Sequence, residues 1–445
     1  MAGTRNSRSP EAALAAAVAA VLSAAGVGAG QRLCLALSGG VDSSLLLHLL
    51  AGLRAQFGFE LAAAHVHHGL SPNADAWQRA CAAQCAAAGI VLHAFRVEVA
   101  RDDPAGLEAA ARTARRAALS RVDCDWLVTG HHQDDQAETL LFRLVRGTGL
   151  RGAGAMAAIE PARPGRLRPL LAVRRADIVA CAQALHLAWV EDESNADPRH
   201  ARNYLRHHVL PVVEAAFPGA VPALARAAGH FREADELLDA LAAQDAAACG
   251  GVTLARDALL ALPDARLRNL LRWCVRRHGA EAPARARLVE AVRQLRAAAP
   301  EHPLHVALGA LACCMYRGQV WLEPALVQAP ARALAWHGED ELAWDGGRVR
   351  FEPVTGAGLS RAALARATAC ELAPRWAGLG MRQGARRPRR SFKNLCQEAG
   401  IPAWLRPRLP VLRVDGEAAW IGEIGVAAQF ACAADEAGIL PVWLR

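Results

Sequence analysis

The sequence predicts an α/β protein: an N-terminal domain built on a parallel sheet, then a helical domain, then a small α+β domain. Two patterns lead to this prediction. In the first half, short apolar runs alternate with longer amphipathic segments, as in a parallel sheet wrapped by helices. After residue 217, apolar residues recur three and four positions apart, as in packed helices, and short alternating runs return toward the C-terminus.

The first half divides into strands and helices in strict alternation. The expected strands are Arg32–Ser38, Phe59–Val66, Ile90–Val97 and Asp125–Gly130. The expected helices are Val41–Arg54, Ala74–Ala88, Leu107–Val122, Asp134–Arg146 and Arg174–His186. Ligands of such sheets bind beyond the carboxyl ends of the strands, so the loops that follow the strands are the candidate site.

The two ends of this domain are less regular. The alanine-rich N-terminus is expected to form an ordinary first helix rather than a signal peptide, because Glu11 interrupts its front and leucine is scarce. No run of about 18 strongly apolar residues occurs, so no membrane span is expected. A hinge near Pro211–Pro222 suggests domain boundaries of 1–217, 218–330 and 331–445.

The cysteines and the lysine exclude several kinds of site. Twelve cysteines include no pair separated by two residues, which argues against a zinc ribbon, an iron–sulfur cluster or a disulfide scaffold. Buried thiols in a reducing cytoplasm fit better. Lys393 is the single lysine and stands outside any glycine-rich loop, so a Walker-type nucleotide site is excluded.

The positive charge is concentrated near the C-terminus. The chain has a formal net charge of +8, yet ten basic residues and only one acid, Glu398, lie between Arg375 and Arg413. The rest of the chain is therefore close to neutral. Such a block is typical of a surface that contacts a phosphate backbone, although a merely solvated basic face is the alternative.

The segment Ser38–Ser44 (S-G-G-V-D-S-S) follows a strand and opens a helix. Its two glycines allow a tight turn, and the helix N-terminus offers unpaired N–H groups to an anion. Asp42 inside an anion site requires a bridging cation, which implies Mg2+. A helix cap in an ordinary turn is the alternative. A second glycine-rich string, Gly147–Gly152, follows a helix rather than a strand, so a dinucleotide site is rejected there.

This loop resembles the PP-loop of the N-type ATP pyrophosphatases, which cleave ATP to AMP and pyrophosphate. The resemblance implies an adenine nucleotide alpha-hydrolase-like fold and an ATP site. The residues expected to bind ATP are Ser38, Gly39, Gly40, Val41, Asp42, Ser43, Ser44, His65, Gly130 and His131.

The segment Gly130–Thr139 (G-H-H-Q-D-D-Q-A-E-T) lies where a strand meets a helix. Asp135 and Glu138 are three apart and so share one helix face. Taken alone, they could form a capping box with Asp135 as N-cap and Glu138 at the third helical position.

Beside the phosphate loop, however, this segment resembles the second motif of the tRNA(Ile)-lysidine synthetases. Further matches are His65–Leu70, Leu107–Arg115, Leu144–Met156, Asp192–Pro211 and, near the C-terminus, Ser391–Pro410. Arg116 and Cys396 stand where the family usually has aromatic residues. The resemblance is dense over the first 215 residues and the last 70, and weak between them.

The resemblance implies ATP-dependent ligation of L-lysine to C2 of the wobble cytidine of a CAU-anticodon tRNA(Ile), through an adenylated tRNA, with release of AMP and pyrophosphate. The codon that the tRNA reads would then change from AUG to AUA, and its amino-acid identity would change from Met to Ile. The resemblance implies catalytic roles for Asp42, Asp135, Glu138 and Arg202, with Asp135 and Glu138 binding the lysine. Contacts with tRNA are expected from Arg112, Arg115, Arg146, Arg206, Arg386, Arg387, Arg389, Arg390 and Lys393.

Three other functions are weighed against this one. A PP-loop tRNA thiolase would need cysteine pairs that the sequence lacks. A small-molecule synthetase of the GMP or NAD type would not explain the His-His-Gln-Asp-Asp string or the basic block. A non-catalytic RNA-binding protein would not need Asp42, Asp135 and Glu138. The sequence leaves open whether the protein forms a homodimer and which carboxylate is the base.

Overall fold

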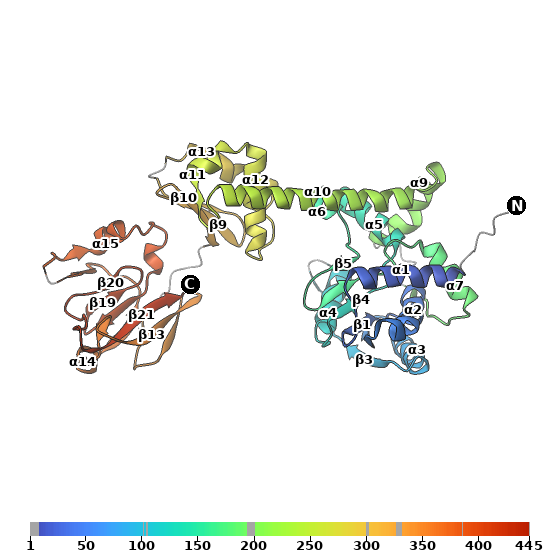
Figure 1. Ribbon diagram of the computed structural model, residues 1–445, viewed down its shortest axis with the longest axis horizontal. Helices are drawn as coiled ribbons and strands as arrows, with labels where there is room; N and C mark the ends of the chain where they lie inside the picture. The colour runs from blue at the N-terminus through green and yellow to red at the C-terminus, as the bar shows by residue number, and fades with distance from the viewer. Residues whose placement is uncertain are drawn as a thin grey trace. The chain divides into compact units, whose positions relative to one another are not determined.

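The computed structural model describes residues 9–100, 102–103, 106–193, 201–299, 302–325, 332–384 and 386–444. These residues form two compact units, Met1–Leu237 and Leu238–Arg445. Helix α10 (Ala220–Ala248) belongs partly to each (Figure 1). The predicted boundary at 217 falls in the turn before this helix, and the boundary at 330 lies outside the described residues. The three-part division stays a prediction.

The first unit contains a six-stranded sheet with strand order β3-β2-β1-β4-β6-β5. All neighbours are parallel except β5, which runs antiparallel to β6. The strands are β1 (Arg32–Ala36), β2 (Glu60–His67), β3 (Val91–Arg96), β4 (Trp126–Val128), β5 (Ile159–Glu160) and β6 (Gly165–Leu167). The predicted parallel-sheet fold is confirmed, with element ends shifted by a few residues.

Helices cover both faces of this sheet (Figure 1). One face packs α1 (Pro10–Ala24), α2 (Val41–Phe57), α3 (Ala74–Ala87) and α7 (Arg175–Ala184) into the largest apolar core of this unit. The other face packs α4 (Leu107–Leu119) through Leu119 and Val122. The chain passes from β1 outward to β3 and then returns to β4 on the other side of β1. A crevice beyond the strand ends is expected at this reversal.

Local sequence explains where these helices begin and end. Ser9 caps α1 by accepting a hydrogen bond from the Ala12 N–H at 3.2 Å, and Pro10 occupies the first turn, where no N–H is needed. Leu14, Val18 and Leu22 then recur every four residues on the buried face. Helix α2 ends at Gly58, whose φ of 74° is the left-handed conformation that glycine adopts readily.

The rest of the first unit is helical. It comprises α5 (Gln133–Leu144), α6 (Leu150–Ala153), α8 (Ala201–Tyr204), the π-helical turn η2 (Leu205–Val209) and α9 (Leu210–Ala216). The expected hinge is the break between α9 and α10, where the chain bends by 101°. Among the described residues, no single helix is long and apolar enough to span a membrane; this bent pair meets the length and composition criterion only when its two parts are taken together.

The second unit has two separate apolar cores. The first core lies between helices and a sheet of order β7-β10-β9-β8. Its elements are β7 (Leu254–Ala255), α11 (Arg256–Ala261), α12 (Asp264–Arg277), α13 (Arg285–Ala297), β8 (Leu304–Ala307), β9 (Leu311–Tyr316) and β10 (Gln319–Pro324).

The second core fills a β-rich C-terminal part with strand orders β11-β15-β18-β19-β20, β12-β13-β21-β14 and β16-β17. Its strands are β11 (Leu334–Ala335), β12 (Glu341–Trp344), β13 (Gly347–Thr355), β14 (Leu359–Ser360), β15 (Cys370–Ala373), β16 (Gly380–Met381), β17 (Arg390–Ser391), β18 (Val411–Val414), β19 (Glu417–Ile421), β20 (Gly425–Val426) and β21 (Ala437–Leu444). Its helices are α14 (Arg361–Ala365), α15 (Phe392–Glu398) and the short η3 (Arg406–Arg408).

Candidate active site

The loop between β1 and α2 is built to receive an anion. Gly39 has a φ of 89°, and a side chain there would meet Val190 Cγ2 at 2.9 Å. Gly40 caps α2 without any side-chain hydrogen bond, so the first-turn amides are left to a ligand or to solvent. The hydroxyl oxygens of Ser38 and Ser43 lie 3.1 Å apart beside these amides. The loop thus has the donors that a pyrophosphate group needs.

Two residues of the predicted ATP set point elsewhere. The Ser44 hydroxyl is within donating distance of the Gly39 carbonyl, at 3.1 Å, and of Gln84 Oε1, at 3.2 Å. His65 is buried, and its Nδ1 lies 2.9 Å from the Leu37 carbonyl. Both side chains therefore support the loop from behind, and their predicted contact with ATP stays a prediction.

The loop after β4 lies directly against this first loop. A Cβ atom on Gly130 would sit 3.2 Å from both the Asp42 carbonyl carbon and the Ser43 nitrogen. Glycine therefore permits the close approach of the two loops. Since β1 and β4 are neighbours at the reversal of strand order, Asp42 and Asp135 stand in the first turns of the two helices that flank the crevice expected there.

His132, not Asp135, caps helix α5. The Asp135 N–H donates to His132 Nδ1 at 3.3 Å, and the His132 N–H donates to Asp135 Oδ2 at 3.0 Å. A capping box is therefore present, but the register weighed above, with Asp135 as N-cap and Glu138 at the third position, is wrong. Glu138 lies one turn further along and takes no part in the cap.

Asp135 and Glu138 both bind the guanidinium of Arg206. Arg206 Nε donates to Glu138 Oε1 at 2.6 Å, and its Nη2 donates to Glu138 Oε2 and to Asp135 Oδ1, each at 3.0 Å. The Glu138 side chain is only 3% exposed. Burial raises the pKa of Glu138, and the hydrogen bond and positive charge of Arg206 oppose this effect without cancelling it. The pair of carboxylates is thus a preformed cation site that the protein's own arginine occupies.

Asp42 is the residue that would hold a divalent cation. Its Oδ1 is buried and has no hydrogen-bond donor among the described residues, and His132 Nε2 lies 3.8 Å away. Burial raises the pKa of Asp42, and the neighbouring Asp135 adds to this effect. A carboxylate oxygen without a donor beside a phosphate-binding loop fits Mg2+, which prefers one or two carboxylates together with phosphate oxygens.

Arginines gather around His131. Its Nδ1 lies 2.8 Å from the Thr129 hydroxyl. Burial lowers the pKa of His131 to about 4, and the positive charges of Arg168, Arg115 and Arg112 contribute, while Asp135 opposes them. The imidazole is therefore neutral at physiological pH. Arg168, which no sequence motif predicts, is buried and donates hydrogen bonds to the Ala157 carbonyl and to Glu160.

Arg202 is half-buried in α8 and lies near other arginines. Burial lowers the pKa of Arg143 and of Arg115, and the charge of Arg202 adds to this effect. Arg143 was also missed by sequence reasoning; its Nη1 donates to the Gly152 and Ala155 carbonyls. Arg146 is exposed and lies 5.0 Å from the centre of the Phe142 ring. A part of the first unit that carries several arginines suits a polyanion.

Part of the predicted motif set is outside the described residues. Ser194 and Asn195 belong to the undescribed segment 194–200, and the side chain of Glu108 is likewise not described.

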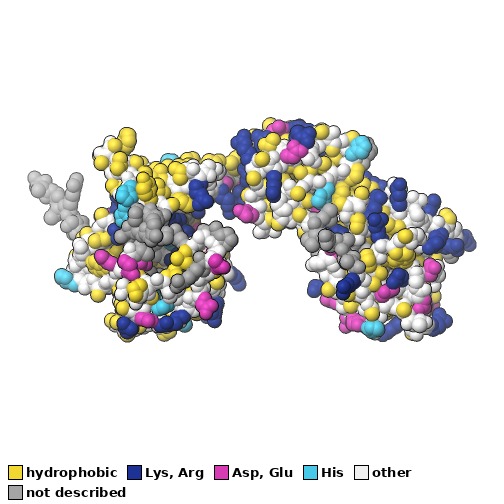
Figure 2. Space-filling model, turned by 180° about the vertical axis from the view of Figure 1, so that it is seen from behind, with side chains coloured by type: hydrophobic (Ala, Val, Ile, Leu, Met, Phe, Trp, Pro, Cys, Tyr) yellow, Lys and Arg dark blue, Asp and Glu magenta, His cyan; other side chains and the backbone are white. Residues whose placement is uncertain are grey.

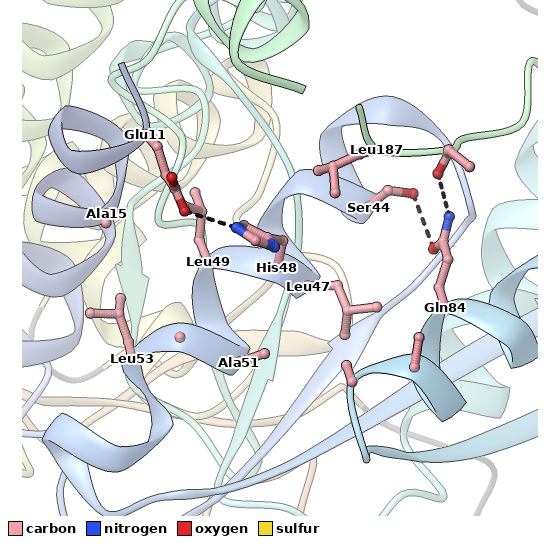
Figure 3. A pocket seen from close by; sticks show the side chains of 14 residues that line it. Glu11, Ala15, Ser44, Leu47, His48, Leu49, Ala51, Leu53, Gln84 and Leu187 are labelled. Atoms are coloured by element: carbon pink, nitrogen blue, oxygen red, sulfur yellow. Dashed lines mark hydrogen bonds and ion pairs between the residues drawn. The ribbon is translucent and has the colours of Figure 1, made fainter. Parts of the chain in front are cut away.

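A cavity of about 630 Å3 lies away from this crevice, between α1, α2 and α3 (Figure 3). Its polar lining consists mainly of the Glu11–His48 pair, 2.9 Å apart, and of Gln84, which donates to the Ala188 carbonyl at 2.7 Å. Ser44 is the one predicted site residue that lines it. Because leucines, alanines and Gly52 form the rest of the lining, this cavity is unsuited to a triphosphate.

The predicted tRNA-contacting residues of the C-terminal part are all exposed, and basic side chains gather on its surface in Figure 2. These are Arg386, Arg387, Arg389, Arg390 and Lys393. Other members of the basic block are engaged internally: Arg408 pairs with Asp345, and Arg413 pairs with Glu371 and lies over the Trp376 ring. The free positive surface is therefore smaller than the sequence count suggests.

The comparisons with known proteins agree with this architecture. Family models match three segments: a PP-loop domain at residues 12–213, a TilS substrate binding domain at 254–321 and a TilS substrate C-terminal domain at 370–443. A tRNA(Ile)-lysidine synthase of Aromatoleum aromaticum is 70% identical over 425 residues, covering 96% of this chain and 100% of that protein. The chain belongs to the tRNA(Ile)-lysidine synthase family.

A second relative in this family, from an Azoarcus species, is 59% identical and covers 97% of this chain and 96% of its own length. Among solved structures, a U34-tRNA thiolase of Methanococcus maripaludis has a TM-score of 0.42 at 20% identity, covering 50% of this chain and 80% of its own. The predicted family and the prediction of an ATP-dependent ligase are confirmed by the family models and the two synthases.

Proposed function

We propose that this enzyme joins the side-chain amine of free L-lysine to C2 of the wobble cytidine in a CAU-anticodon tRNA(Ile). The observation that carries the proposal is the pair Asp135 and Glu138, a buried cation site that lies beside a phosphate-binding loop. A synthase that uses both ATP and an ammonium-bearing substrate needs these two sites next to each other.

The first step is transfer of AMP. The C2 oxygen of the cytidine attacks the α-phosphorus of ATP, the bond to pyrophosphate breaks, and the oxygen becomes part of a good leaving group. The amides of Gly40–Ser43 and the hydroxyls of Ser38 and Ser43 hold the departing pyrophosphate. Mg2+ bound at Asp42 would offset the negative charge of the phosphates.

The second step is attack by lysine. Its ammonium replaces the Arg206 guanidinium on Asp135 and Glu138, because the guanidinium occupies both Glu138 oxygens and one Asp135 oxygen as acceptors. With an amine pKa of about 10.4, only about one lysine in a few thousand is unprotonated at neutral pH, so a carboxylate must take the proton. The free amine then forms the C–N bond at C2, and AMP leaves with the oxygen.

The displaced Arg206 would be released toward the tRNA. An arginine that leaves one anionic partner needs another, and the phosphates of the adenylated nucleotide are suitable. Arg202 lies one helical turn before Arg206 and would contact the same phosphates. The product would read AUA instead of AUG and would be charged with isoleucine instead of methionine.

The test uses purified protein, ATP, Mg2+, radiolabelled lysine and unmodified CAU-anticodon tRNA(Ile). We expect acid-precipitable label that survives mild alkaline deacylation and disappears when the wobble cytidine is changed to uridine. Label that is lost on deacylation would mean simple aminoacylation and would contradict the proposal. AMP release without label would support the adenylation step but would show that lysine is not the nucleophile.

A further inference from the structure

The sheet of the middle part has two unlike faces. Side chains alternate along its strands, and one face buries Val306, Cys313, Met315 and Val320 in the core. The opposite face carries His305, Cys314, Trp321 and Glu323. These four residues are far from the candidate active site in sequence and belong to the other compact unit.

Strand register brings three potential metal ligands of this face together. His305 on β8 is the direct partner of Cys314 on β9. Glu323 on β10 pairs with Ala312, two residues from Cys314, and is therefore its diagonal neighbour on the same face. One ligand atom from each of His305, Cys314 and Glu323 lies within 4.8 Å of the other two.

The Glu323 carboxylate of this cluster accepts hydrogen bonds from neutral groups only, among the residues that the structure describes. Glu323 accepts from the Cys314 thiol at 3.2 Å, from Trp321 Nε1 at 3.2 Å and from Trp404 Nε1 at 2.5 Å. Glu323 forms no ion pair with any residue that the structure describes. His305 Nε2 is buried without a hydrogen-bond partner, and Cys314 is fully buried.

We propose that His305, Cys314 and Glu323 bind a borderline-soft divalent cation of the Zn2+ class. Imidazole, thiolate and carboxylate are the ligands that Zn2+ takes, and tetrahedral bonds of about 2.0–2.3 Å require ligand atoms about 3.3–3.8 Å apart. The ligand atoms now lie within 4.8 Å of one another, so binding would have to draw the most distant pair closer by about 1–1.5 Å. The Cys314 thiol loses its proton to solvent, so one thiolate and one carboxylate balance the two charges of the metal. The fourth position is left to water.

The cation would also fix the C-terminal part on this sheet. Trp404 donates to the same Glu323 oxygen that faces Cys314, and its ring lies 5.7 Å from that of His305. A hydrogen bond to a ligating carboxylate orients that ligand and is sensitive to its charge. Arg317 donates to the Gln397 carbonyl at 2.8 Å and forms a second link between the same two parts. Metal binding would therefore hold the segment that contains the basic block.

The test is a titration of the metal-free full-length protein with Co2+, which gives a thiolate charge-transfer band when cysteine binds it. We expect one tight Co2+ per chain in the wild type and in Cys313→Ala, whose cysteine is equally buried but on the opposite face. The band should be lost in Cys314→Ala, and affinity should fall about tenfold or more in His305→Gln.

A second readout separates metal binding from misfolding. A chelator should lower the Tm of the wild type and of Cys313→Ala, and should leave the Tm of Cys314→Ala unchanged. A wild type with no tight Co2+ site, or an unchanged band in Cys314→Ala, would overturn the proposal. Neither readout depends on lysine ligation, so failure here leaves the proposed function intact.

Discussion

The carboxylate of Glu138 is almost fully buried, and Arg206 supplies its positive partner through two hydrogen bonds. A charge-assisted hydrogen bond contributes about 1.5–3 kcal/mol. The binding of either cation, lysine or arginine, therefore depends on the negative charge of Glu138 rather than on its shape.

We predict that Glu138→Gln, which keeps the volume and removes the charge, raises the KM for lysine about 10- to 100-fold. The KM for ATP should change far less, because both Glu138 oxygens accept hydrogen bonds from Arg206, which lies outside the phosphate loop. Steady-state ligation kinetics with each substrate varied in turn would measure both. Glu60→Gln, at the exposed amino end of β2, is the matched control. An equal loss for ATP and lysine would contradict the assignment.

A second prediction at this scale concerns pH. The pKa of His131 is lowered to about 4, chiefly by burial, whereas in the unfolded chain it is about 6.5. The folded state therefore binds fewer protons than the unfolded state between these values, so His131 costs stability as pH falls from about 6.5 toward 4. Above about 6.5 this cost is absent.

Urea unfolding of the wild type and His131→Asn at pH 7.5 and pH 5 would measure this effect. The wild type should lose more unfolding free energy on acidification than the variant does. His93→Asn, an exposed histidine on β3, should behave as the wild type. Identical losses in His131→Asn and wild type would show that the imidazole is not held neutral.

At the scale of elements, the site depends on how closely two loops approach. The loop after β4 reaches the N-terminus of α2 only because Gly130 has no side chain. We predict that Gly130→Ala, whose new Cβ would press on the backbone of Asp42 and Ser43, raises the KM for ATP or lowers kcat about tenfold or more.

The control is Gly28→Ala, because a Cβ at Gly28 meets nothing within 4 Å. Near-ultraviolet circular dichroism would verify that both variants keep their tertiary structure. Unimpaired pyrophosphate release by Gly130→Ala would mean that the close approach of the loop after β4 to the phosphate loop does not matter for ATP turnover.

The elements of the first half were predictable from sequence because local patterns determine them. Alternation of apolar runs located β1 to β4 and their helices within a few residues. The cap of α5 was not predictable in register, because Asp134, Asp135 and His132 are all able to cap. The structure chooses His132, whose ring is buried against Asp42 and Asp135.

At the scale of the whole molecule, we propose that the exposed basic residues of the C-terminal part hold the tRNA. Such an interaction should weaken as the salt concentration rises. If each removed charge contacts one phosphate, the slope of log K against log salt changes by about 0.7–0.9 per residue.

We predict that alanine at Arg386, Arg387, Arg389, Arg390 and Lys393 together makes this slope less negative by up to about 4. The kcat at saturating tRNA should stay near the wild-type value, because these residues are remote in sequence from the catalytic loops. Filter binding over a range of salt concentrations measures the slope. A control variant removes the exposed Arg361 and Arg366 around α14. The same slope in the wild type, the five-alanine variant and the control would mean that the basic block is a solvated surface that does not contact tRNA.

The sequence by itself determined the phosphate loop, the Asp135–Glu138 face and the basic block, because each is a local string whose spacing carries its chemistry. Only the tertiary structure decided that Arg206 pairs with Glu138, 68 residues away, and with Asp135, 71 residues away. It also decided that Arg408 and Arg413 pair with internal carboxylates. It also joined His305, Cys314 and Glu323, which no motif connects. Pairings of this kind depend on strand register and helix packing, which bring together residues whose separation along the chain has no fixed period.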